Sequence, residues 1–280
     1  MRKIPLLAVL LAAGLAVTAC DIKTSANGNF SFDIATGKAT DTWTRTYKVS
    51  PKGRFELINV NGRISAEPTD GNELVVEGHR TAKARSDDAA KELLEKMEIR
   101  EEVSDSTVRV ESRPPRLSGF SGHEVEWTIK VPKGIVVDLR TANGGVRLHG
   151  LSNEIHAKST NGGVKGDDLI ASVIEARTVN GGVELELKSA LTATDSIEME
   201  SVNGGVSLDL PADSKATISA RCVNGGVKVG ELDIKRDDES ANDFERKRRL
   251  SGTMNGGGGR IEMSTTNGGV HIGRTGKSTT

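Results

Sequence analysis

The tetrapeptide Asn-Gly-Gly-Val recurs along the second half of this chain and constrains its fold more than any other feature. It begins at Asn143, Asn161, Asn180, Asn203, Asn224 and Asn267, with shortened relatives at Asn61 and Asn255. Successive Asn residues of the six full motifs lie 18, 19, 23, 21 and 43 residues apart. A repeat of about 20 residues is the signature of stacked units, each too small to bury its own apolar face.

Each repeat alternates between apolar and polar residues. Before Asn180, for example, the small or apolar residues Ile174, Ala176 and Thr178 are separated by Glu175 and Arg177. This period of two predicts one strand before the motif, and the Val that follows the glycines begins a second, shorter strand. Asn and Gly accept positive φ at little cost, so the motif itself is expected to form the bend between the two strands.

Two arrangements of these strands are compatible with the motif. Asn-Gly between alternating strands is a strong hairpin signal, which leaves an antiparallel meander or barrel as an alternative. Several columns of matching residue size recur together with the Asn, however, and this favours parallel stacking in register with a ladder of hydrogen-bonded Asn side chains. The sequence therefore predicts an all-β fold, a right-handed parallel β-helix or solenoid of short coils with Asn-Gly-Gly bends and one short helix near its N-terminal end.

The first 20 residues have the organisation of an export signal. Arg2 and Lys3 precede an apolar run that ends in Val17-Thr18-Ala19-Cys20. This terminus resembles the lipobox of bacterial lipoproteins, and the resemblance implies cleavage of residues 1–19 and lipidation of Cys20. We expect a membrane anchor in the bacterial cell envelope, on the periplasmic side if the cell is Gram-negative. An ordinary cleaved signal is the alternative, and the choice of inner or outer membrane stays open.

The rest of the chain divides by composition. Residues 20–41 are expected to be a flexible tether, and 42–138 a β-rich part with one short helix that Ser86 caps and that plugs an open end of the stack. Residues 139–273 hold the repeats, interrupted by a charged insertion at 231–253. We expect 42–273 to form one continuous domain.

Composition and motifs argue against several classes of function. The 38 basic and 39 acidic residues leave no basic footprint for nucleic acid. The five His residues are scattered, and Cys222 stands in a column of Ser and Thr, so we expect neither a metal nor a cofactor. Glu175 and Glu198 share an outward column that a polysaccharide-cleaving β-helix could use. Ion pairs with the neighbouring basic column explain them without catalysis, and we expect no catalytic residue.

One outward row is only half polar and is a candidate binding strip. It consists of the residues immediately before each Asn, which are Ala142, Thr160, Val179, Val202, Val223 and Thr266. Val179, Val202 and Val223 would give it an apolar, flat surface with a pitch of about 4.8 Å per coil, suited to an extended polymer or to a partner's strand. The plainer interpretation is that β-branched residues occur there for their strand propensity.

The order of these features resembles the putative-adhesin family of β-strand-repeat envelope proteins. The resemblance rests on the bend at Asn61-Gly62, the strand end Val131-Pro132-Lys133-Gly134, the glycine-rich segment Leu250–Gly258 and the final motif Thr266–Val270, and it spans about residues 47–272. It implies a β-solenoid with an adhesive or envelope-stress-sensing role and supplies no catalytic residues. We therefore expect a non-catalytic binding or scaffolding protein that contacts envelope polysaccharide or an envelope protein. An envelope-stress regulator and a polysaccharide-active enzyme are the alternatives.

Overall fold

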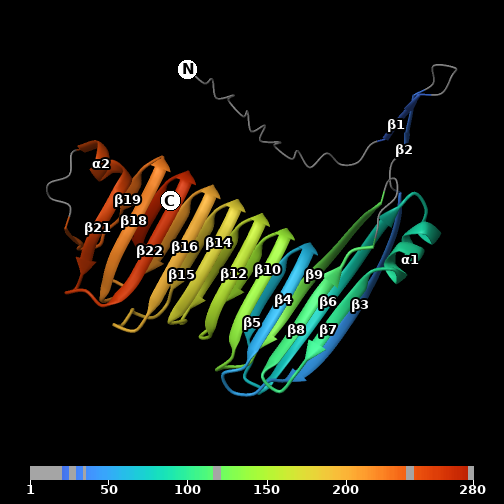
Figure 1. Cartoon of the computed structure of the whole chain (residues 1–280), viewed down its shortest axis with the longest axis horizontal. Helices are drawn as coiled ribbons and strands as arrows, with labels where there is room; N and C mark the ends of the chain where they lie inside the picture. The colour runs from blue at the N-terminus through green and yellow to red at the C-terminus, as the bar shows by residue number, and fades with distance from the viewer. Residues whose placement is uncertain (1–20, 25–29, 34–35, 116–120, 238–242, 277–280) are drawn as a thin grey trace, which may run out of the picture.

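The computed structural model describes residues 21–24, 30–33, 36–115, 121–237 and 243–276. The expected signal segment and Cys20 lie outside these residues. The short strands β1 (Asp21–Thr24) and β2 (Phe30–Asp33) pair with each other in antiparallel fashion. All other strands belong to two large sheets, which form one elongated stack (Figure 1). No helix among the described residues is long and apolar enough to span a membrane.

Each sheet runs the length of the stack. Sheet I contains, in spatial order, β7 (Glu98–Val103), β8 (Thr107–Arg113), β4 (Arg54–Asn61), β10 (Val136–Asn143), β12 (Glu154–Asn161), β14 (Val173–Asn180), β16 (Ser196–Asn203), β22 (Gly259–Asn267), β18 (Ala216–Asn224), β21 (Arg249–Met254) and β20 (Lys235–Arg236). Sheet II contains β3 (Gly37–Lys48), β6 (Glu73–Ala84), β9 (Gly122–Val131), β5 (Ile64–Pro68), β11 (Val146–His149), β13 (Val164–Leu169), β15 (Val183–Leu187), β17 (Val206–Leu210), β23 (Val270–Arg274) and β19 (Val227–Val229). We call a strand of sheet I, its Asn-Gly bend and the following strand of sheet II a rung.

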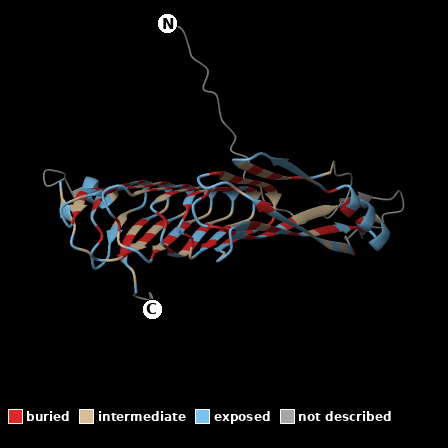
Figure 2. Ribbon diagram, turned by 90° about the horizontal axis from the view of Figure 1, so that it is seen from below, coloured by how far each residue is buried: buried red, intermediate tan, exposed pale blue. Residues whose placement is uncertain are grey.

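Neighbouring rungs are parallel and in register. Ile174 lies opposite Ile155 on one side and Ile197 on the other, and Asn180 lies opposite Asn161 and Asn203. The antiparallel alternative for the repeats is therefore wrong. The apolar columns face each other between the sheets and are buried along the whole stack (Figure 2). Stacking of like residues on like explains why the columns keep their size from repeat to repeat.

The rungs do not follow chain order at either end of the stack. The rung of β4 and β5 lies between β8 and β9 on one side and β10 and β11 on the other. The rung of β22 and β23 likewise lies between β16 and β17 and the earlier rung of β18 and β19. Within the 43 residues before Asn267, the chain first forms β20 and β21 on the outer side of β18. It then returns to form β22 and β23 on the inner side, between the rung of β16 and the rung of β18.

The two ends carry different additions. At the N-terminal end β3, β6 and β9 pair in antiparallel fashion, and α1 (Asp87–Glu95) packs on β3 and β6 with Ala90, Leu93 and Leu94 buried. The Ser86 hydroxyl caps this helix as expected, accepting from the Ala89 N–H. β3 starts at Gly37, inside the stretch expected to be a tether. At the other end the charged segment supplies β20, α2 (Asp243–Arg248) and β21, which pairs antiparallel with β18.

Candidate binding surface

The Asn residues of seven successive bends form a ladder along one edge of the stack. Each side-chain amide nitrogen donates to the side-chain oxygen of the next Asn toward the N-terminal end, over 2.8 to 2.9 Å. The spatial order is Asn61, Asn143, Asn161, Asn180, Asn203, Asn267 and Asn224. The ladder expected from the sequence is present, and it includes Asn61. Asn255 stays outside it, because its amide donates to the carbonyls of Ala212 and Ser214.

The glycine that follows each Asn is required by the stacking. Gly204 has a φ of 158°, and a Cβ added there would lie 2.0 Å from the carbonyl oxygen of Gly181 in the next rung. Side chains are excluded by that contact and by the positive φ. The same Gly181 carbonyl accepts a hydrogen bond from the buried Ser201 hydroxyl at 2.8 Å. Thr141, Ser159, Thr178 and Thr265 make the equivalent bond in their rungs.

The ends of the ladder differ. At the N-terminal end the Asn61 amide nitrogen lies 3.0 Å from Nε2 of His123, to which it donates, and burial lowers the pKa of this His side chain. At the other end Asn224 is the last rung and is exposed. Cys222, two residues before Asn224, stands where the other full repeats have a Ser or Thr hydroxyl, is 6% exposed and has a thiol pKa raised by burial. Cys222 is thus a small buried residue, as the sequence suggests.

The candidate strip lies beside this ladder, on the outer face of sheet I. Val179, Val202 and Val223 are 41%, 37% and 54% exposed, and Thr160 and Thr266 are exposed as well. The order along the surface differs from the order in the chain, because Thr266 on β22 separates Val202 from Val223. We call the row Ala142, Thr160, Val179, Val202, Thr266 and Val223 the edge strip. Val179 and Val202 therefore lie in adjacent rungs, whereas Thr266 lies between Val202 and Val223 and is part of the same surface.

The charged column next to the edge strip is largely neutralised by ion pairs. Arg177 contacts Glu198 at 2.7 Å and Glu175 at 3.1 Å, and Lys158 contacts Glu175 at 2.8 Å. Arg140 binds both oxygens of the buried Asp138, at 2.9 and 2.6 Å. Glu200 and Ser264 interrupt the basic residues of the same column. The sequence interpretation of Glu175 and Glu198 as ion-paired with the neighbouring basic column is confirmed.

Glu175 is held in its ionised form. Burial alone would raise the pKa of its carboxyl group, but hydrogen bonds from Lys158 and His156 and the charges of Lys158 and Arg177 outweigh burial and lower the pKa to about 2. A general acid in glycoside cleavage needs a raised pKa so that it carries a proton near neutral pH. Glu175 is therefore unsuited to donate a proton.

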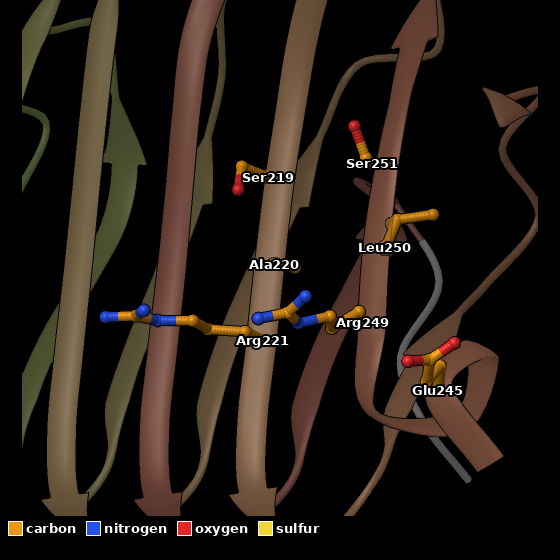
Figure 3. A pocket seen from close by; sticks show the side chains of 7 residues that line it. All are labelled: Ser219, Ala220, Arg221, Glu245, Arg249, Leu250 and Ser251. Carbon is orange, nitrogen blue, oxygen red and sulfur yellow. The ribbon is translucent and has the colours of Figure 1, made fainter. Parts of the chain in front are cut away.

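A shallow pocket occurs where β18, β21 and α2 meet (Figure 3). It is lined by Ser219, Ala220, Arg221, Glu245, Arg249, Leu250 and Ser251. Arg249 extends from β21 toward β18, and Glu245 stands on α2. Only one lining residue carries a carboxyl group, so the pocket does not offer the carboxyl pair of a glycosidase. Within the ranges that the structure describes, no group of three His, Cys, Asp or Glu side chains is placed to hold a metal ion.

No protein-family model matches this chain, and no curated protein matches it. The chain is similar to a solved structure described as a putative cell adhesion protein from Clostridium sporogenes, with 15% identity, a TM-score of 0.47 and coverage of 84% of this chain and 100% of that one. It is also similar to a putative adhesin from Bacteroides fragilis, with 14% identity, a TM-score of 0.43 and coverage of 84% and 97%. These descriptions belong to those proteins.

Proposed function

We propose that this chain is a lipid-anchored protein of the bacterial cell envelope that binds or scaffolds through the edge strip, without catalysis. Cys20 carries the lipid, and the stack stands off the membrane on the segment that follows it. The exposure of Val179, Val202 and Val223 in one row supports the proposal most directly. Together with Ala142, Thr160 and Thr266 they form a narrow, flat surface beside the row of Asn side chains, outside the buried core.

The body of the protein is in this proposal a right-handed parallel β-helix. Parallel strands of sheet I are connected through strands of sheet II, and crossovers between parallel strands are right-handed in about 98% of known cases. A crystal structure of the chain would test the hand directly. A left-handed coil would contradict this part of the proposal and leave the position of the edge strip unchanged.

The chemistry of the edge strip favours a polysaccharide as ligand. Except at the terminal rung of Asn224, the backbone at each bend is already hydrogen-bonded to the neighbouring rungs, which leaves a partner strand little to pair with along the strip. The flanking charges are paired, which disfavours a strongly charged polymer. Valine methyl groups and exposed Asn amides together suit a chain that presents C–H faces and hydroxyl groups in alternation. The rungs repeat about every 4.8 Å, which provides one set of contacts after another along an extended polymer.

The absence of catalysis in the proposal rests on the state of the outward carboxylates. Glu175 is ionised and bound by three basic side chains, and Glu198 is bound by Arg177. The aromatic rings that often stack on sugars in cleavage sites are at the N-terminal end, where Trp127 is buried and Trp43 is half-buried. A Glu175→Gln, Glu198→Gln double variant should therefore leave envelope polysaccharide as intact as the parent does.

Binding is tested by co-sedimentation with insoluble envelope polysaccharide. The chain carries Cys20→Ser, which removes the lipid, and is compared with a form that also carries Val179→Asp, Val202→Asp and Val223→Asp. We expect the parent to sediment with the polysaccharide and the triple variant to lose at least about tenfold in affinity, because carboxylates replace the apolar contacts. Little dependence on salt is expected, since paired charges contribute little.

Val103→Asp is the matched control. Val103 on β7 is 59% exposed, so the substitution has the same chemistry on an exposed strand outside the edge strip. We expect it to bind as the parent does. Equal binding by the parent and the triple variant would overturn the strip as the site, and equal loss by Val103→Asp would show that added charge alone prevents association.

A further inference from the structure

The terminal rung of the Asn ladder is that of Asn224. It differs from the other six rungs in the hydrogen bonds made by the Asn side-chain oxygen and by the N–H of the following glycine. We propose that Asn224 is a site of spontaneous deamidation, the one rung of the ladder at which the folded protein leaves this reaction open. The product, aspartate or isoaspartate, would place a negative charge and an altered backbone at the distal end of the edge strip.

The reaction needs only water. The backbone nitrogen of the glycine loses its proton and attacks Cγ of the Asn side chain, and the new C–N bond closes a five-membered succinimide. The bond from Cγ to Nδ2 breaks, and the side-chain nitrogen leaves as ammonia. Water then opens either carbonyl of the succinimide and gives aspartate or isoaspartate. Glycine in the following position favours the attack, because no Cβ hinders the nitrogen.

Six rungs hold both partners of this reaction in hydrogen bonds. In the rung of Asn180, the Gly181 N–H donates to the carbonyl of Asn203 at 3.0 Å, and the Asn180 side-chain oxygen accepts from the Asn203 amide at 2.9 Å. The N–H groups of Gly62, Gly144, Gly162, Gly204 and Gly268 donate to the next Asn carbonyl in the same way. The attack therefore requires that two bonds break and that the bend move away from both neighbouring rungs.

The bend of Asn224 is hydrogen-bonded to a neighbouring rung on one side only, although β21 and α2 contact β18 on the outer side. Its amide donates to Asn267 and its carbonyl accepts from Gly268, so it is bound to the inner rung. On the outer side β21 pairs with β18 only from Ala216 to Arg221. The bend at Asn224 and Gly225 lies beyond this paired segment. Among the described residues nothing donates to the Asn224 side-chain oxygen or accepts from the Gly225 N–H. Gly225 is exposed, whereas its counterparts are half-buried or buried.

The modification would act on the rung that carries it. An aspartate at position 224 has no amide hydrogen to donate to the Asn267 oxygen, and its own oxygens would repel that atom. Isoaspartate adds a backbone atom and disturbs the register with β22. Both products weaken the last rung, which includes Val223 of the edge strip and β19.

The chain provides its own internal comparison. Trypsin cleaves after Arg140, Lys158 and Arg221 and releases Thr141–Arg147, Ser159–Lys165 and Cys222–Lys228, each with Asn in third place before Gly-Gly-Val. The folded, unlipidated chain is incubated at mildly alkaline pH, digested, and analysed by mass spectrometry for the acid form of each peptide. We expect deamidation at Asn224 to be roughly tenfold or more faster than at Asn143 and Asn161, because the bend at Asn224 opens with fewer bonds broken.

The same incubation in concentrated urea is the control, because an unfolded chain exposes all three motifs to similar chemistry. We expect the three rates to converge there. Equal rates in the folded chain, or a slower rate at Asn224, would overturn the proposal. An Asn224→Ser variant assigns the signal in the intact protein: the early acidic form seen on ion exchange should disappear, and its persistence would place the modification elsewhere and overturn the assignment.

Discussion

The N-terminal and C-terminal ends of the stack are closed in different ways. At the N-terminal end antiparallel strands extend sheet II, α1 packs on them, and the largest buried side chains gather, among them Trp127 and Phe55. At the C-terminal end β21 covers part of sheet I, while sheet II stops at the three residues of β19, with Val229 37% exposed. The first end has a core of its own, whereas the second depends on the rung beneath it. The stack should therefore begin to unfold from its C-terminal end.

The largest effect is expected from Trp127→Ala. The ring is 1% exposed, lies over Gly78 and meets Trp43 edge-on with the ring centroids 5.7 Å apart. Removing it leaves a cavity at the closed end and should lower the free energy of unfolding by about 3–5 kcal/mol in urea denaturation. Trp43→Ala, at a half-buried ring in the same cluster, should cost less. A larger loss for Trp43 would show that the core of this end is not centred on Trp127.

Gly204→Ala tests the stacking in the middle of the molecule. The new Cβ would meet the Gly181 oxygen at a positive φ, and we expect a loss of roughly 2–4 kcal/mol by urea denaturation. Gly205→Ala is the neighbouring control, since its Cβ would lie 3.5 Å from the nearest atom and should cost little. The corresponding change at Gly225 creates the same close contact, but in the terminal rung it should fray that rung without unfolding the stack. A global loss at Gly225 would contradict the difference between centre and end.

Glu175 makes a pH-dependent contribution to the middle of sheet I. Its pKa is about 2 in the folded chain and is lower than in the unfolded chain, so its stabilisation is present above about pH 4.5 and is lost as pH falls toward 2. Glu175→Gln should cost about 1–3 kcal/mol at pH 7 and less at pH 3. Urea denaturation at both pH values measures the difference, and Glu184→Gln on sheet II is the control. An equal cost at both pH values would show that the ion pairs do not stabilise the fold.

The smallest effect is expected from Cys222→Ser in the terminal rung. The hydroxyl would restore the column and donate to the Gly268 carbonyl, as Ser201 does to Gly181. We expect a gain of up to about 1 kcal/mol, visible as slower amide hydrogen exchange in β18 near the bend. Ser201→Cys removes the same bond in the centre and should speed exchange there. Faster exchange after Cys222→Ser would indicate that this end is held by packing of the sulfur.

The sequence predicts much of this fold because its pattern reports local requirements. Alternation at Ile174, Ala176 and Thr178 shows which face is buried, and the Ser86 hydroxyl marks the start of a helix. The order of the rungs could not be predicted in this way. Asn224 and Asn267 carry the same motif and are interchangeable by pattern, so the choice of neighbour depends on where the segment between them packs. The 43-residue interval, roughly two periods long, is the available signal, but an insertion between two neighbouring rungs would explain it equally well.

The sequence predicts which residues of the candidate surface are exposed, but not the order in which they lie along it. Exposure of Val179, Val202 and Val223 follows from alternation, whereas the position of Thr266 between two of them follows from the order of the rungs. The end of the ladder at His123 could not be found from the sequence, because 62 residues separate it from Asn61 and no repeat links them. The ion pairing of Glu175 and Glu198 was predictable because alternation places opposite charges in neighbouring outward columns, whereas the exact partners depend on rotamers.

The displaced rungs also have a consequence for the synthesis of the chain. During synthesis from the N-terminus, β18 with Asn224 is made before β22, the strand that lies between β18 and β16. In the same way, β4 with Asn61 is made before its neighbour β10. A nascent chain that already contains β18 can only complete this end after another 40 or so residues have been delivered. Loss of residues 259–274 would therefore remove β22 and β23, which lie inside the stack. Proteolysis in this segment would separate the rung of β18 and β19 from the rest of the molecule.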